Sequence, residues 1–186
     1  MTTKNAVNTT LEIIGSEGMS GIKVTASSMN EACRKFGLKD LDDSQISRVI
    51  TEIRRQNLAE ITHTQKTFHF QLSVKGIHRL QRAQVERVMI AKPAAWDHLW
   101  RMVTYDVPRT QSAQRRLFAR QLDRLGFTMI RESVWFHPYP CFEAVEEIVR
   151  YCGLQRHVTL AEISRIDNIS LSKLTRAYPS LNSRHS

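Results

Sequence analysis

The sequence predicts an α+β fold made of two modules. Residues 9–83 show helical periodicity that ends in a short pair of alternating strands. Residues 100–138 instead follow the pattern of a strand, a helix with regularly spaced arginines and a further strand pair. Because the two patterns differ and 186 residues can build two small cores, we expect a first domain at 1–90, a second at 91–169 and a flexible tail at 170–186.

The first module is predicted to contain two successive amphipathic helices. Residues 27–36 place apolar side chains at helical spacing, with a serine as N-cap and Gly37 at the end. A second helix is expected from Ser44, capped by Asp42, Asp43 or Ser44 itself. Its apolar stripe consists of Ile46, Val49, Ile50 and Ile53.

The polar face of this second helix is suited to contact DNA. Such side chains can bond phosphates and, near a helix N-terminus, reach base edges in a major groove. The candidate residues are Ser44, Gln45, Ser47, Arg48, Thr51, Arg54 and Arg55. An ordinary solvated face on a core helix is the alternative explanation.

A hairpin and a third helix follow. Residues 57–72 alternate as two strands, with the tip at Thr64 to Lys66. Residues 73–90 then show helical spacing up to a break at Lys92 and Pro93. The order of helix, recognition helix, hairpin and helix is that of a winged helix-turn-helix domain, which would place Lys66 at the end of the wing and against DNA.

The second module is predicted to have a ferredoxin-like βαββαβ fold. A strand ends at Asp106 and Pro108, and the helix within residues 112–127 ends at Gly126. Two strands, a helix and a final strand complete the order, which defines an antiparallel sheet covered by two helices. The first helix carries an exposed stripe of Arg116, Arg120 and Arg124, also expected to contact DNA.

The charge favours a polyanionic partner. The chain has 27 Lys and Arg against 18 Asp and Glu, a formal charge of +9, and the expected partner is double-stranded DNA. Cys33, Cys141 and Cys152 are widely spaced, so neither a disulfide framework nor a zinc site with His137 is expected, and no cofactor is assigned. With no signal peptide pattern and no run of eighteen apolar residues, we expect a cytoplasmic protein without a membrane partner.

Two stretches carry a resemblance to known families. ISRVITEIRRQNLAEI and FHFQLSVKGIHRL resemble the winged helix-turn-helix of bacterial transcriptional regulators, which implies that the helix from Ser44 enters the groove, in a homodimer. VTYDVP, RRLFARQLDRLGF and SVWFHP resemble the middle domain of the PaaX family of repressors. The resemblance implies a dimeric repressor of PaaX type. That family carries a further C-terminal helical domain, which we expect to be lacking because this sequence ends soon after Ile169.

The PaaX middle domain is similar in turn to the CRISPR-associated endonuclease Cas-two. That family uses an aspartate at the end of its first strand, and the matching residue here is Asp106, which implies a magnesium-dependent nuclease or CRISPR-adaptation subunit as the alternative function. A two-fold dimer would bring two such carboxylates to one ion. Alternatively Asp106 caps the turn at Pro108. A third possibility is an adaptor that clamps DNA through the arginine stripe without chemistry. Trp96, Trp100 and Trp135 are expected in the core or at dimer contacts.

Overall fold

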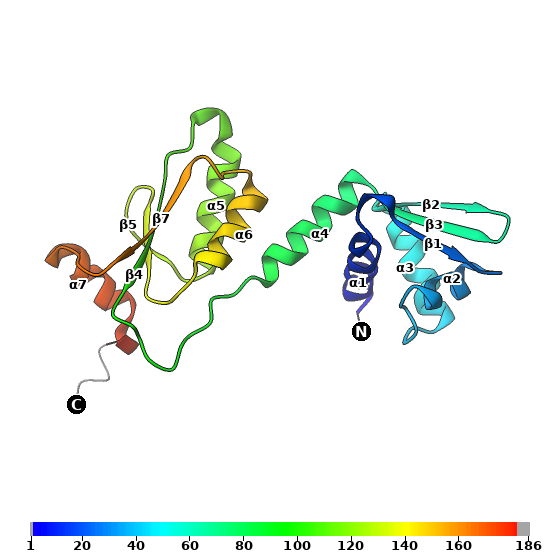
Figure 1. Cartoon of the computed structure of the whole chain (residues 1–186), viewed down its shortest axis with the longest axis horizontal. Helices are drawn as coiled ribbons and strands as arrows, with labels where there is room; N and C mark the ends of the chain where they lie inside the picture. Colours follow the sequence, from blue (N-terminus) through cyan, green and yellow to red (C-terminus); the bar gives the residue numbers. More distant parts are fainter. Residues whose placement is uncertain (1, 182–186) are drawn as a thin grey trace. The chain divides into compact units, whose positions relative to one another are not determined.

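The computed structural model describes residues 2–181. These residues form two compact units that divide between Glu86 and Arg87. Each unit has its own antiparallel sheet, one of three strands and one of four (Figure 1).

The first unit combines four helices with the three-stranded sheet. Along the chain it contains α1 (Thr3–Ser16), the 3₁₀ turn η1 (Gly18–Ser20), β1 (Ile22–Thr25), α2 (Met29–Lys35), α3 (Asp43–Arg55), β2 (Ala59–Thr64), β3 (Thr67–Leu72) and α4 (Val74–Arg87). The sheet order is β1-β3-β2, with β3 antiparallel to both neighbours. The two predicted helices, the hairpin and the following helix are confirmed, whereas α1 and β1 were not predicted.

The core of the first unit fixes which face of α3 meets solvent. One hydrophobic cluster contains fully buried side chains from three elements: Leu11 and Ile14 of α1, Ile46 and Ile53 of α3, and Phe70 of β3. Each such side chain contributes about 1.5–3 kcal/mol when removed from water. The apolar stripe predicted for α3 is therefore confirmed, and its polar face lies on the outside of the unit.

A close backbone contact requires glycine at position 76. A Cβ atom at Gly76 would lie 1.8 Å from the carbonyl oxygen of Leu58, which also accepts the backbone N–H of Ser73 at 3.0 Å. Because the Cβ is attached directly to the backbone of α4 and the Leu58 oxygen is itself a backbone atom, no side-chain movement can relieve the clash, and Gly76→Ala is expected to destabilise the first unit by about 3 kcal/mol. Thermal unfolding followed by circular dichroism would measure the loss. The control Lys75→Ala, at an exposed position of the same helical turn, should stay within about 0.5 kcal/mol, and an equal stability of both variants would contradict the contact.

The second unit has the predicted βαββαβ order. Its elements are β4 (Trp100–Tyr105), η2 (Arg109–Gln111), α5 (Ser112–Arg124), β5 (Thr128–Arg131), β6 (Val134–His137), α6 (Phe142–Cys152), β7 (Val158–Ile163), α7 (Asn168–Ala177) and η3 (Pro179–Leu181). The sheet order β5-β6-β4-β7, antiparallel throughout, is that of the ferredoxin-like fold. Figure 1 shows α5 and α6 on one face of the sheet and α7 on the other.

The prediction of a flexible tail from residue 170 is wrong for the described residues. Asp167 caps α7 by accepting the first free backbone N–H groups, and Leu174 is fully buried in a cluster with Trp100 and Phe136. The hydroxyl of Tyr178 donates to the carbonyl of Phe136 at 2.9 Å. The polar composition of this segment concealed one apolar face that packs on the sheet. Residues 182–186 of the predicted tail lie outside the described residues.

Candidate nucleic-acid interface

The start of α3 is held by a capping box. Asp42 accepts the backbone N–H of Gln45 at 2.8 Å, and the Gln45 side-chain oxygen accepts the backbone N–H of Asp42 at 3.0 Å. Ser44 also donates its hydroxyl to Asp42 at 2.8 Å. These bonds, that from the Gln45 backbone foremost, hold the pKa of Asp42 below its usual value. Ser44 and Gln45, both predicted to contact DNA, thus use their side chains to fix the helix terminus.

The exposed face of α3 carries four polar side chains in a row, which we call the α3 stripe: Ser47, Arg48, Thr51 and Arg54. Within residues 2–181, the side chains of Ser47, Thr51 and Arg54 have no hydrogen-bond or ion-pair partner. Arg48 donates a hydrogen bond to the Ser44 hydroxyl at 3.2 Å. Such groups remain available to bond phosphates and base edges.

Arg55 lies next to the α3 stripe but is neutralised by a neighbouring carboxylate. Its guanidinium donates to both oxygens of Glu52, at 2.8 and 2.6 Å. Glu52 also accepts the side-chain amide of Gln56, which in turn accepts a bond from Arg79 at 2.6 Å. Hydrogen bonds, first that of Arg55, lower the pKa of Glu52 to about 2, so the ion pair persists at neutral pH. Of the predicted contacts on α3, Arg55 is the cation least available to DNA.

The β2–β3 hairpin presents Lys66 at its tip. Gln65 adopts a left-handed φ of 52°, and the two-residue turn leaves Thr64 paired with Thr67. The carbonyl of Lys66 accepts the backbone N–H of Ala26 at 2.8 Å, so the tip is anchored near the end of β1. Its ammonium is exposed and has no partner in the described part of the chain.

The arginine stripe predicted on α5 is exposed, but its members differ in whether their side chains already bond other residues of the chain. Arg116 and Arg120 have no side-chain partner among the described residues. Arg124 instead donates to the side chain of Gln121 at 2.8 Å and to the carbonyl of Val88 at 3.0 Å. Arg124 therefore has a structural role within its own unit.

Asp106 lies on an exposed loop directly after β4. Its backbone N–H donates to the carbonyl of His157 at 2.9 Å. The turn-capping alternative is contradicted, because η2 follows Pro108 and α5 follows Gln111 without a side-chain cap in either case. Within the described residues, no three His, Cys, Asp or Glu side chains form a metal-binding group.

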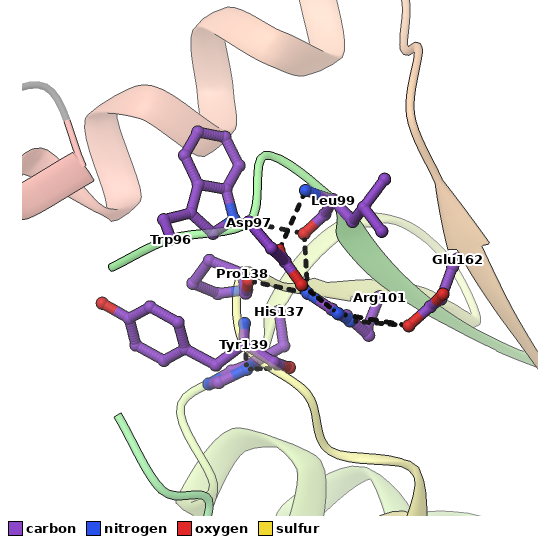
Figure 2. A network of polar contacts seen from close by, with 8 residues as sticks. All are labelled: Trp96, Asp97, Leu99, Arg101, His137, Pro138, Tyr139 and Glu162. Carbon is purple, nitrogen blue, oxygen red and sulfur yellow. Dashed lines mark hydrogen bonds and ion pairs between the residues drawn. The ribbon is translucent and has the colours of Figure 1, made fainter. Parts of the chain in front are cut away.

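A buried arginine fixes the segment that leads into β4. The Arg101 side chain is 3 % exposed, and it donates to the carboxylate of Asp97 at 2.8 and 2.5 Å and to Glu162 at 3.2 Å. It also donates to the carbonyls of Leu99 at 3.1 Å and Pro138 at 3.2 Å (Figure 2). The bonds to Asp97 are the main reason why the pKa of Arg101 is raised. This network joins residues preceding β4 to the β6–α6 connection and to β7.

The second unit is similar to a known domain family. Residues 93–174 match the model of the PaaX protein central Cas2-like domain. This unit is PaaX-like. The match spans β4 to β7 and most of α7, so it includes Asp106 and the Arg101 network. A comparison with curated proteins found no match. No helix within the described PaaX-like unit or the first unit is long and apolar enough to cross a membrane.

Proposed function

We propose that the chain is a DNA-binding transcriptional regulator of PaaX type, acting in the cytoplasm as a dimeric repressor. The first unit would be its winged helix-turn-helix domain. The order α1, β1, α2, α3, β2, β3 and the three-stranded sheet support this assignment. The PaaX-like second unit supports a regulator of the same type.

The α3 stripe is the observation that carries the proposal. Packing into the core requires only the buried face of a helix. The exposed face of α3 nevertheless presents two arginines and two hydroxyl side chains with few protein contacts. A helix of this kind can enter a major groove and bond base edges. Lys66 at the wing tip would then hold a flanking phosphate.

A dimer would bring two such helices to one DNA site. We assign dimerisation to the ferredoxin-like unit, and its two-fold axis would set the spacing between two half-sites. Arg116 and Arg120 would add phosphate contacts.

The salt dependence of binding tests this proposal. Electrophoretic shift of a duplex at increasing salt should show affinity falling steeply, by about 10³-fold between 50 and 200 mM for six or more phosphate contacts. Lys66→Ala should reduce the slope of log affinity against log salt by about one. Lys4→Ala, a change at an exposed lysine of α1, is the matched control. Absent or salt-insensitive binding would contradict the proposal.

A magnesium-dependent nuclease is the second candidate, favoured by the position of Asp106. Its carboxylate is exposed, follows the first strand of a Cas2-like domain and has no partner within residues 2–181. Two copies across a dimer axis could hold one magnesium ion, which would activate water for phosphodiester cleavage.

A cleavage assay separates this candidate from the regulator. If the chain is only a regulator, duplex DNA stays intact with magnesium, and Asp106→Asn binds DNA as tightly as the unmodified chain. Magnesium-dependent cleavage that Asp106→Asn abolishes would instead establish the nuclease. Asp123→Asn, an exposed aspartate on α5, should have no effect in either case.

A further inference from the structure

The second unit contains a small cavity whose lining includes neither the arginines of α5 nor Asp106. Its volume is about 200 Å³. The segment that precedes β4 forms one wall, and Tyr139 and the η3 turn form others. Lys92, Trp96, His98, Tyr139 and Leu181 are among the residues that line it.

The cavity offers aromatic surfaces held in a fixed orientation. The indole N–H of Trp96 donates to the carbonyl of Leu99 at 3.2 Å, and its ring packs 5.1 Å from that of Trp100 and 5.0 Å from that of His98. In Figure 2, Trp96 and Tyr139 both lie on the side of the network away from Glu162. Rings restrained in this way provide flat faces against which another planar ring can stack.

The polar groups of the cavity favour an anion. The ammonium of Lys92, the imidazole of His98 and the hydroxyl of Tyr139 make no hydrogen bond to other residues of the described chain. All three can donate hydrogen bonds, and Lys92 carries a positive charge. The described residues that line the cavity include no aspartate or glutamate, and the neighbouring carboxylate of Asp97 is paired with Arg101.

The backbone at this cavity is strained and held by its surroundings. His98 adopts a left-handed φ of 64°, and its neighbours Asp97 and Leu99 both bond to Arg101. A non-glycine residue in this conformation costs about 1–3 kcal/mol unless the surrounding structure imposes it, and such residues gather at binding sites. The Arg101 network therefore keeps the imidazole of His98 in the wall of the cavity.

We propose that this cavity binds a planar aromatic ring that bears a carboxylate or phosphate group. The ring stacks against Trp96 and Tyr139, and the anion pairs with Lys92. Pockets for drug-sized ligands span about 300–1,000 Å³, so this cavity takes a smaller molecule with one ring or two. The proposal does not depend on DNA binding, and no part of its test requires DNA.

Isothermal titration calorimetry on the full chain tests the proposal with four probes. Benzoate and uridine 5′-monophosphate each have a ring and an anion, benzamide has the ring without the charge, and acetate has the charge without the ring. We expect saturable binding of at least one ring-bearing anion, about tenfold or more tighter than benzamide and acetate. Preference for benzoate identifies an aromatic carboxylate as the ligand class, and preference for the nucleotide identifies a phosphate-bearing base.

Two lysine variants locate the binding site. Lys92→Met should weaken binding of the preferred probe by about tenfold, because it removes the charge from an exposed side chain without opening the core. Lys173→Met changes an exposed lysine of α7 that is not among the lining residues, and it should bind as the unmodified chain does. Equal binding by Lys92→Met and the unmodified chain, equal binding of acetate and the preferred ring-bearing anion, or no binding of either ring-bearing anion at millimolar concentration would overturn the proposal.

Discussion

The double substitution Arg48→Ala and Arg54→Ala is expected to weaken duplex binding by about a hundredfold, since each lost arginine contact to a base edge costs about 1–3 kcal/mol. Both side chains lie on the exposed face of α3, and neither is part of the core. The variant should therefore unfold at the same temperature as the unmodified chain. Fluorescence anisotropy with a labelled duplex at one fixed salt concentration measures the change in Kd.

Arg55→Ala is the matched control for this result. Arg55 follows Arg54 directly on the same helix, but its guanidinium is held by Glu52 through two hydrogen bonds. Its removal should change Kd by less than about threefold, because its donors bond Glu52 and are not free to contact a base or a phosphate. A loss as large for Arg55→Ala as for the double variant would show that binding follows the number of arginines and not the α3 stripe.

Arg101→Ala is expected to destabilise the second unit by about 3 kcal/mol, a typical cost for removing one partner of a buried ion pair. The change leaves the carbonyl of Pro138 without its hydrogen-bond donor, and it removes the cation that pairs with both Asp97 and Glu162. Arg101→Met keeps much of the side-chain volume and should lose less, about 2 kcal/mol, from the unmade hydrogen bonds alone.

Tryptophan fluorescence measures this loss selectively. All three tryptophans of the chain, Trp96, Trp100 and Trp135, lie in the second unit. For a unit of this size, 3 kcal/mol corresponds to a fall in Tm of about 15 °C. Arg165→Ala, at an exposed position after β7, is the control and should shift Tm by no more than about 2 °C. A Tm for Arg101→Ala equal to that of the control would mean that the network contributes no stability.

The parts of the fold that the sequence predicts well are those with local signals. For α3, an apolar stripe at helical spacing and a choice of three N-caps predicted the helix, and the structure selects Asp42 as the cap. The hairpin followed from alternation on both sides of a polar turn. In the ferredoxin-like unit, local signals predicted each strand and helix of the order βαββαβ. Few sheet topologies are possible for this order, so the fold could be predicted from it.

The missed elements had weak local signals. α1 contains several threonines and asparagines, which favour a helix poorly, although Val7, Leu11 and Ile14 are buried on one face. β1 has four residues and exists because it pairs with β3. α7 is stabilised by packing against the sheet of its own unit, and this tertiary contribution outweighs its polar composition.

The side-chain environment of the candidate sites was less predictable. The exposed face of α3 could be listed from the sequence, but the pairing of Arg55 with Glu52 depends on rotamers. Alternation along β4 placed Arg101 on the same face as the buried Val103, and a charge at such a position is the signal that could have indicated the network. The cavity at Lys92 and Tyr139 joins residues distant in sequence, and no pattern predicted it.

Selection of bound sequences from a random duplex library, run in parallel with magnesium and with a chelator, tests whether the chain is a sequence-specific DNA-binding regulator. We expect that the full chain enriches a two-fold-symmetric motif, that the DNA remains intact in both conditions, and that the Arg48→Ala and Arg54→Ala double variant loses this enrichment. Magnesium-dependent cleavage without enrichment of any sequence would contradict a regulatory function and would assign a nuclease site to Asp106.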